Sequence, residues 1–475
     1  MLPCIVSRVI PRTVLGALLL SASVAFAQAP LTAGQRELRA IYQELVEINT
    51  TDSAGDCTRA SEAMASRMRS GGFTQAEVQV LVPPGAPKKG NLVARLAGTG
   101  AVRPLLMLAH IDVVEAKRED WTRDPFKLIE EGGYFYARGA SDNKAMASVF
   151  VANLIRWKRE GLRPSRDLVL ALTCDEEIIP SPHNGVEFLL RQHRPLVDAE
   201  FAINEGGGGV RSADGRRLRV TVQAGEKVFQ SWQLEVTGKG GHSALPVADN
   251  PITHLADGLA RLGRFEFPFK LLETPRRFFE RMAALEPARS ADMRAMLAEP
   301  PDLAAAARLA ASSPQYNALM RTTCIATMVE AGHATNAQAQ RARAVVNCRI
   351  LPGEPVAQVR DTLVRVLAND RIAVTPMGEA VPSPAAPLRG AMFEAIESVT
   401  AEMYPGVPLI PTMSAGATDG RFLNNAGIPT YGVSGMFRDA DGGGVHGLNE
   451  RFPVSSLYEG QEYLYRLVMK LAAPR

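Results

Sequence analysis

The sequence predicts an α/β protein in which a doubly wound, mostly parallel sheet is interrupted by a smaller α+β lid and dimerisation domain. Three apolar, strand-like runs each end next to a residue that can bind a divalent metal: LLMLA before His110, DLVLALTC before Glu176 and EFAIN before Glu205. From about residue 32 to 220, segments with helical spacing alternate with strand-like segments, which is typical of a parallel sheet covered on both faces. This alternation resumes after Pro352-Gly353, so we expect the carboxyl-terminal part to complete the first sheet.

Length and composition favour an ordinary globular protein of two or three domain-sized units. The chain has 475 residues, of which 46% are hydrophobic and 22% charged, and its formal net charge is only +3. No dense run of Lys and Arg is interleaved with aromatic residues. We therefore do not expect nucleic acid to be a partner.

The amino-terminal residues predict a secretory signal peptide over residues 1–27. Arg8 and Arg12 precede the apolar stretch 14–27, and the small residues Ala25 and Ala27 suit cleavage before the mature chain. This stretch is shorter than the roughly 20 residues of a membrane helix, although an uncleaved anchor is the alternative. We expect a periplasmic or secreted protein without stable membrane association after the signal is removed.

The mature chain divides into three segments. Residues 28–224 form the first part of the catalytic domain, and a helix is expected from Met146 to Trp157. Residues 225–353 form the lid, with a strand at Gln230–Val236, a helix at Pro251–Leu262 and strands at Thr322–Glu330 and Ala342–Leu351. A stretch at about 267–317, punctuated by Pro275, Pro287, Pro300 and Pro314, predicts a helical insertion. Residues 354–475 complete the catalytic domain, with helices at Val356–Ala368, Ala391–Met403 and Ser456–Leu471 and a strand at Thr430–Val433.

The cysteines of the mature chain leave the disulfide pattern open. Export would place Cys57, Cys174, Cys324 and Cys348 in an oxidising compartment, where bridges are permitted but not required by an even count. Cys324 and Cys348 lie on two strand-like segments, and a cross-strand bridge between them is one alternative. Cys174 lies inside an apolar strand, where a small buried hydrophobic residue is the expected role.

The residues at the strand ends and in the glycine-rich loops suit two metal ions that share one site. Such a site needs about four protein ligands and one bridging group, drawn from imidazoles and carboxylates. The candidates are His110 with Asp112 two residues later, Asp142 after the loop RGAS, the adjacent Glu176 and Glu177, Glu205 before four glycines, and His446 within GGGVHG. Each alone has an ordinary explanation as a hydrogen-bonded histidine, a helix cap or a solvated acidic turn. Their joint placement favours a dinuclear centre.

Several motifs resemble the co-catalytic dizinc peptidase and amidohydrolase family that includes acetylornithine deacetylase, succinyl-diaminopimelate desuccinylase, aminoacylase and glutamate carboxypeptidase. They span essentially the whole mature chain: LAHIDVV, ARGASDNKA, CDEE, NEGGG, GKGGHSALP, NCRILPG, SAGATDGRF and GVHGLNE. The resemblance departs at Asn143 and Ala145, where the family usually has a second acid and a glycine. The position that would bridge the metals is intact.

The resemblance implies a role for each candidate residue. His110 and Glu205 would hold one zinc ion and Glu177 and His446 the other, while Asp142 would bridge them. Glu176 would be the general base for a metal-bridging hydroxide, and Asp112 would orient His110. Substrate binding would involve His242, Asn336, Arg349 and Gly416, and in dimeric members the lid histidine reaches the site of the partner subunit. Cobalt or manganese would also suit such ligands.

These implications predict an enzyme that cleaves an amide or peptide bond next to a free carboxylate. The expected substrate is an N-acyl amino acid or a short peptide, and we expect a homodimer. Two alternatives stay open: a dipeptidase or aminopeptidase on the same scaffold, and a metal-binding protein of this fold that lacks catalysis. Neither the preferred acyl group or side chain nor the role of the helical insertion follows from the sequence.

Overall fold

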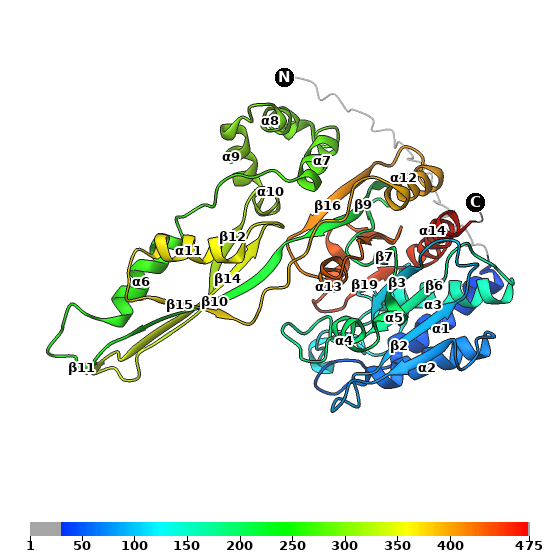
Figure 1. The fold of residues 1–475 in the computed structure, drawn as a ribbon, viewed down its shortest axis with the longest axis horizontal. Coiled ribbons are helices and arrows are strands. Elements are labelled where there is room, and N and C mark those ends of the chain that lie inside the picture. Colours follow the sequence, from blue (N-terminus) through cyan, green and yellow to red (C-terminus); the bar gives the residue numbers. More distant parts are fainter. Residues whose placement is uncertain (1–29, 474–475) are drawn as a thin grey trace, which may run out of the picture.

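A computed structural model describes residues 30–473, and its largest element is a ten-stranded sheet (Figure 1). The predicted signal peptide, residues 1–27, lies outside the described residues. The strands are β1 (Val78–Leu81), β2 (Asn91–Leu96), β3 (Leu105–His110), β6 (Leu168–Thr173), β7 (Phe201–Asn204), β8 (Gly209–Arg211), β9 (Arg217–Glu226), β16 (Leu409–Ser414), β17 (Thr430–Gly432) and β18 (Phe437–Asp439). Their order is β1-β2-β6-β3-β7-β17-β9-β8-β18, with β16 paired to β9. The central strands β6, β3, β7 and β17 are parallel.

Helices cover both faces of this sheet, as the sequence predicted. One face carries α1 (Ala33–Glu47), α2 (Cys57–Ser70), α3 (Lys144–Arg159), α12 (Ala391–Met403) and α14 (Val454–Ala472), and the other carries α4 (Gly185–Gln192), α5 (Arg194–Val197) and α13 (Gly420–Asn425). Strand β3 serves both cores because successive side chains point to opposite faces. Leu105 and Met107 join the first cluster, whereas Leu106 and Leu108 join the second. The predicted doubly wound architecture is confirmed.

A second sheet forms the part of the chain that the sequence predicts to be the lid, and we keep that name for it. Its strands are β10 (Val228–Thr237), β12 (Thr323–Ala331), β14 (Arg341–Ile350) and β15 (Ala373–Met377), in the antiparallel order β12-β14-β10-β15. Helices α6 (Pro251–Leu262) and α11 (Val356–Leu367) pack on it through one apolar cluster. Only Lys227 separates β9 from β10, so this strand path connects the two sheets. At the far tip of the lid, β11 (Gly241–His242) pairs with β13 (Ala337–Gln338) (Figure 1).

The helical insertion packs against the catalytic sheet. It consists of α7 (Glu273–Met282), α8 (Pro287–Leu297), α9 (Leu303–Ser312) and α10 (Pro314–Met320). Its apolar core includes Ile410 and Met413 of β16. Arg281 of α7 also donates a hydrogen bond of 2.6 Å to the carbonyl of Leu409. Because β16 pairs with β9 alone, α7 covers an otherwise open strand edge.

A small sheet brings the late part of the chain to the carboxyl end of β3. It contains β4 (Ile129–Glu131), β5 (Tyr134–Tyr136) and β19 (Arg451–Pro453), and β19 pairs with β5. Two short 3-10 turns lie nearby in sequence, Arg118–Asp120 and Gly442–Gly444. This pairing places residues 446–450 beside the loop 138–142.

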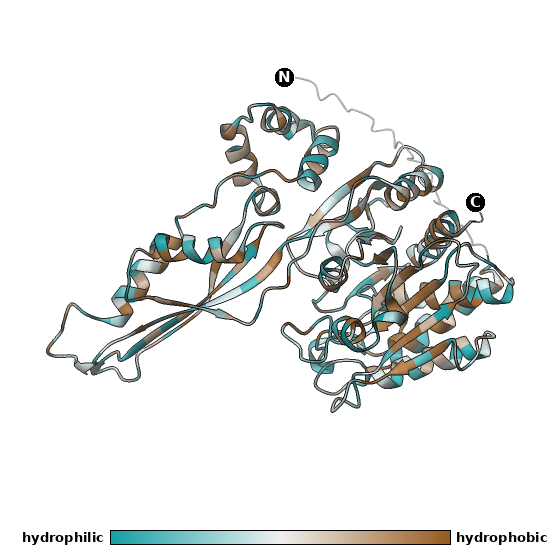
Figure 2. Cartoon of the chain, viewed as in Figure 1, coloured by the Kyte–Doolittle hydropathy of each residue, from teal (hydrophilic) through white to brown (hydrophobic). Residues whose placement is uncertain are grey.

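Hydropathy follows the packing of the large sheet between two layers of helices. Figure 2 shows the central strands of the large sheet as hydrophobic, and every side chain of β3 and β6 is buried. Within residues 30–473, no helix combines the length and apolar character that a membrane span requires.

Both pairs of cysteines in the described chain form disulfides. Cys324 and Cys348 face each other on β12 and β14, so the cross-strand alternative is confirmed. Cys174 is buried, but it is bonded to Cys57 rather than acting only as a small hydrophobic residue. The expectation for Cys174 was incomplete because its partner is 117 positions away at the start of α2, and sequence spacing does not show that proximity.

Candidate active site

The carboxyl ends of three neighbouring parallel strands converge on one site. His110 is the last residue of β3, the turn with Glu176 and Glu177 follows β6, and Glu205 directly follows β7. In an open α/β sheet, loops from such strand ends meet at one edge and form the usual place for an active site.

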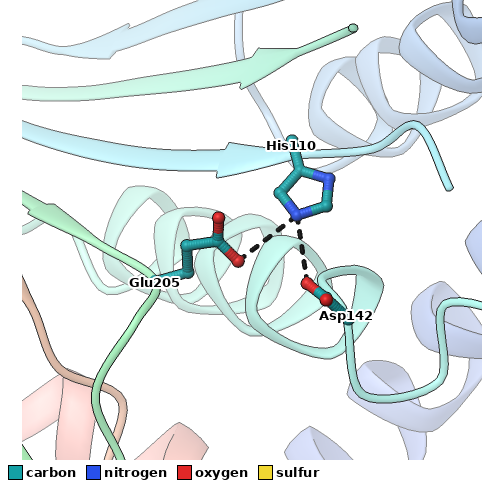
Figure 3. A group of neighbouring side chains, drawn as sticks. All are labelled: His110, Asp142 and Glu205. Atoms are coloured by element: carbon teal, nitrogen blue, oxygen red, sulfur yellow. Dashed lines mark hydrogen bonds and ion pairs between the residues drawn. The ribbon is translucent and has the colours of Figure 1, made fainter. Parts of the chain in front are cut away.

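The first metal-binding candidate group contains His110, Asp142 and Glu205 (Figure 3). Nε2 of His110 lies 3.1 Å from Oδ1 of Asp142 and 3.3 Å from Oε2 of Glu205. His110 is buried, and the two carboxylates are largely shielded from solvent. One imidazole nitrogen and two carboxylates therefore point at a common position.

The second group contains Asp142, Glu177 and His446. Nε2 of His446 lies 3.0 Å from Oε1 of Glu177 and 3.2 Å from Oδ2 of Asp142. The two oxygens of Asp142 thus face different histidines, Oδ1 toward His110 and Oδ2 toward His446. This arrangement suits a carboxylate that bridges two cations.

Asp112 connects the histidine of the first group to the acidic turn. Its Oδ1 lies 3.6 Å from Nδ1 of His110, and its Oδ2 accepts a hydrogen bond of 3.0 Å from the backbone N–H of Glu177. Glu176 is buried, and its carboxylate belongs to a third compact group with His110 and Glu177. Asp112 therefore lies where it can orient the His110 ring. The carboxylate of Glu176 lies next to both metal-binding groups.

Burial and the crowding of ionisable groups shift several pKa values in the cluster. Burial raises the pKa of Glu205 to about 7, and burial together with the Glu205 carboxylate raises the pKa of Glu176 well above its ordinary value. Burial alone would raise the pKa of Asp142, but hydrogen bonds with His110 and His446 hold it well below its usual range. Hydrogen bonds to Asp142 and Glu177 raise the pKa of His446 to about 10.

This donor set fits divalent metals. Imidazole nitrogens and carboxylate oxygens are the ligands that zinc, cobalt and manganese accept. Cations at the two groups would replace the protons that otherwise relieve the crowding of buried carboxylates.

Glu450 is a site residue that the sequence did not reveal. Its buried carboxylate accepts hydrogen bonds from the backbone N–H groups of Gly139, Ser141 and Asp142, at 3.0, 2.7 and 3.1 Å. It also pairs with the buried Arg138 at 2.8 Å. Glu450 therefore fixes the loop that aims Asp142 between the two histidines. The motif GVHGLNE contains this residue, but nothing in its spacing indicates the contact.

Asp175 begins the acidic turn, and the sequence pattern predicted no separate role for it. It has a φ of 65°, and its carboxylate lies 2.6 Å from Nζ of Lys89 and 2.7 Å from Oγ of Ser181. The side-chain amide of Asn184 donates to its carbonyl at 3.1 Å. Together with the Cys57–Cys174 disulfide one residue earlier, these contacts fix the start of the turn.

The four predicted substrate-binding residues do not lie together. His242 and Asn336 are adjacent at the lid tip, where the N–H of Ser243 donates to the carbonyl of Asn336, far from the metal-binding groups of the same chain (Figure 1). Arg349 lies at the lid base in β14, and its guanidinium stacks 4.7 Å from the ring centre of Phe229.

Gly416, the fourth of these residues, is exposed in the loop between β16 and α13. Its N–H donates to Oγ of Ser414 at 3.0 Å. The same loop carries Thr418, whose N–H donates to the buried carboxylate of Glu226.

The profile of peptidase family M20/M25/M40 matches residues 106–470. The chain belongs to this family. It is therefore a metal-dependent hydrolase of the metallopeptidase and amidohydrolase type.

Similar curated proteins include several amidohydrolases. The N-fatty-acyl-amino acid synthase/hydrolase PM20D1 of Xenopus tropicalis is 29% identical over 73% of this chain and 68% of its own length. The probable carboxypeptidase S-like 2 of Dictyostelium discoideum is 26% identical over 78% of this chain and 72% of its own length. A succinyl-diaminopimelate desuccinylase of Delftia acidovorans is 37% identical over a shorter region, 36% of this chain and 44% of its own length.

Solved structures share the fold at low sequence identity. The M20 family metallo-carboxypeptidase Sso-CP2 of Sulfolobus solfataricus has a TM-score of 0.67 at 20% identity, covering 92% of this chain and 98% of that one. YXEP of Bacillus subtilis, described as a dinuclear metal binding peptidase, has a TM-score of 0.58 at 12% identity, covering 93% and 99%. These similarities support the two-part architecture.

Proposed function

We propose that the chain is an exported hydrolase with two zinc ions that cleaves an amide or peptide bond next to a free carboxylate. N-acyl amino acids are the first substrate candidates, and carboxypeptidase activity on short peptides belongs to the same class. The observation that carries the proposal is the position of Asp142, whose two oxygens face His110 and His446 separately. The named activities of PM20D1 and of the carboxypeptidase S-like relative support this substrate class.

In this proposal five residues bind the metal ions and a sixth, Glu176, transfers a proton. His110 and Glu205 would hold one ion, Glu177 and His446 the other, and Asp142 both. When bound, such ions activate water near neutral pH and polarise a carbonyl oxygen. Glu176 would accept a proton from the attacking water and deliver it to the leaving nitrogen, a role typically worth about 10²–10⁴ in rate.

Arg349 is the proposed partner of the substrate carboxylate. Its Nη1 is buried without a hydrogen-bond partner among residues 30–473, and burial lowers its pKa. A bidentate carboxylate would satisfy this unpaired donor and neutralise the charge. The guanidinium is already oriented by the ring of Phe229.

We also propose a homodimer, because the lid tip is remote from the site of its own chain. His242 and Asn336 would then contact substrate in the partner subunit. An apolar surface on the edge strand β12 supports an association through the lid, since Ile325, Met328 and Val329 are each more than two-thirds exposed, at 68%, 68% and 69%.

The proposed location is the periplasm or the extracellular space, with residues 1–27 removed. The two disulfides support it, because such bonds persist mainly in oxidising compartments. We propose residues 28–224 and 354–475 as the catalytic domain and residues 225–353 as the lid.

A substrate panel tests the activity. The chelated protein, reloaded with zinc, cobalt or manganese in turn, is given N-acetyl amino acids, their methyl esters, and dipeptides with free or acetylated amino termini. We expect metal-dependent hydrolysis that requires the free carboxylate and tolerates the blocked amino group. A strict need for a free amino group would instead favour a dipeptidase or aminopeptidase, and tight metal binding without any turnover would favour a non-catalytic protein.

A further inference from the structure

A cavity of about 520 Å³ lies beside the candidate active site, between the catalytic sheet and the base of the lid. Its apolar wall comes from the segment after the acidic turn, from α4 and α13, from the start of β10 and from the coil after β15. The apolar side chains are Ile178, Ile179, Leu190, Phe229, Val381 and Phe422. All six are at least partly exposed, so they present an apolar surface to the cavity.

The cavity adjoins the segment that carries Glu176 and Glu177. Ile178 directly follows Glu177 in the chain. Asn184, another lining residue, donates 2.7 Å to Oδ1 of Asp419, a buried carboxylate whose Oδ2 lies 3.4 Å from the hydroxyl of Thr173 at the end of β6. The lining of the cavity therefore begins one residue after the acidic turn.

Two arginines lie at the wall nearest the lid. Arg421 lines the cavity, and Arg349 stacks on the ring of Phe229, which also lines it. Burial and the nearby charge of Arg421 lower the pKa of Arg349. Within the described chain, neither guanidinium makes an ion pair, although Arg421 donates to the carbonyl of Thr418 at 3.3 Å. Burial raises the pKa of the Asp419 and Glu226 carboxyls and the charge of Arg421 counteracts this rise, but neither carboxylate forms an ion pair with Arg421. The two neighbouring guanidinium groups can therefore still bind an anion.

Three polar residues of the cavity already have partners. Glu187 and Arg191 form a salt bridge of 2.5 Å along α4, and the amide of Asn184 is bonded to Asp175 and Asp419. Glu379, which is exposed, and Asn425 also line the cavity. The rest of the surface is largely apolar, with Arg421 on the wall.

We propose that this cavity is the subsite for a large apolar side chain on the residue that carries the free carboxylate, and that Arg421 binds this carboxylate together with Arg349. The proposal rests on the function proposed above. In an N-acyl amino acid, the carboxylate and the side chain share one carbon atom. A carboxylate fixed at the two arginines therefore directs the side chain toward Phe229, Val381 and Phe422.

The expected preference follows from apolar burial. Moving a phenylalanine-sized side chain out of water should favour N-acyl-phenylalanine over N-acyl-alanine by about 10- to 100-fold in kcat/KM. Introducing a charge into the cavity should remove this preference, because the large apolar side chain would then be buried against a charged group.

The test uses the full metal-loaded protein and four substrates: N-acetyl-alanine, N-acetyl-phenylalanine, N-lauroyl-alanine and N-lauroyl-phenylalanine. We expect Val381→Asp to reduce the ratio of kcat/KM for the phenylalanine over the alanine substrate to within about 2-fold. Val364→Asp, at an exposed position on α11, is the matched control and should behave as the parent protein. Ile179→Asp repeats the test at a 42% exposed position if Val381→Asp fails to fold. Arg421→Gln should raise KM for all four substrates and change kcat little.

Two results would overturn the proposal. One is an equal effect of Val381→Asp on alanine and phenylalanine substrates. The other is a preference that follows the lauroyl chain and is lost in Val381→Asp, because the cavity would then receive the acyl group. If no substrate is hydrolysed, the proposed function has failed; calorimetry with N-acetyl-phenylalanine and N-acetyl-alanine still tests the cavity, since tighter phenylalanine binding must disappear in Val381→Asp.

Discussion

Nε2 of His446 lies 3.0 Å from Oε1 of Glu177, although the two residues are 269 positions apart in the chain. The pairing of β19 with β5 brings His446 to the turn that follows β6. The fold thus completes the second metal-binding group only when the last part of the chain is in place.

Glu176→Gln separates proton transfer from metal binding. The amide keeps the size of the side chain but cannot accept the proton, so we expect kcat to fall by about 10²–10⁴-fold with metal content unchanged. Steady-state kinetics and elemental analysis measure both quantities. Glu119→Gln, at an exposed position, is the control. Unchanged kcat in Glu176→Gln would remove Glu176 from the mechanism.

Glu450→Ala tests the support of the bridging loop. The substitution leaves Arg138 buried without its partner and frees three backbone N–H groups, so we expect a loss of about 3–5 kcal/mol in unfolding free energy. Metal affinity should also fall, because the loop no longer aims Asp142. Denaturant titration provides the measurement. Glu459→Ala breaks a surface pair with Arg217 and should cost about 0–1 kcal/mol; equal losses in the two variants would argue against this role.

The Cys57–Cys174 disulfide should affect both stability and turnover. Cys57→Ala/Cys174→Ala should lower the unfolding free energy by about 2–5 kcal/mol. It should also lower kcat at temperatures where the protein stays folded, because Cys174 is two residues before Glu176. Cys324→Ala/Cys348→Ala removes the lid disulfide and should lower stability without lowering kcat. Similar kcat values for the two double variants would show that the first bridge does not position the turn.

The chelated protein should lose stability as pH rises. The pKa of Glu205 is raised from 4.5 to about 7 and that of His446 from 6.5 to about 10, so the folded site retains protons that the unfolded chain has released. The unfolding free energy contributed by these groups therefore falls between about pH 4.5 and 10. Denaturation at pH 5.5 and 8.5 measures it, with Glu205→Gln/His446→Gln as the control. A chelated parent protein whose stability changes with pH no more steeply than that of this variant would contradict the expectation.

Local signals predicted many of the elements. Helix α6 begins at Pro251 and ends at Leu262, as expected, because Asn250 caps its first turn and the chain turns at Gly263. Helix α12 also has the predicted bounds, and the insertion contains the expected short helices. Such features depend on neighbouring residues, so a single sequence contains them.

Contacts between distant segments were harder to predict. The structure brings together the five proposed ligands and places Asp112 and Glu176 beside them, although their individual roles remain predictions. The contact of Glu450 with the loop 138–142 spans more than 300 positions, and no local pattern distinguishes this acid from the many others. The Cys57–Cys174 bond was missed for the same reason.

Anomalous diffraction from crystals of the zinc-loaded protein tests the dinuclear centre. We expect two zinc peaks, one held by His110 and Glu205 and the other by Glu177 and His446, with Asp142 contacting both; in His446→Ala the second peak should be lost and the first retained. A single peak in the parent protein, or two peaks with His446 outside coordination distance of both, would contradict the proposed site.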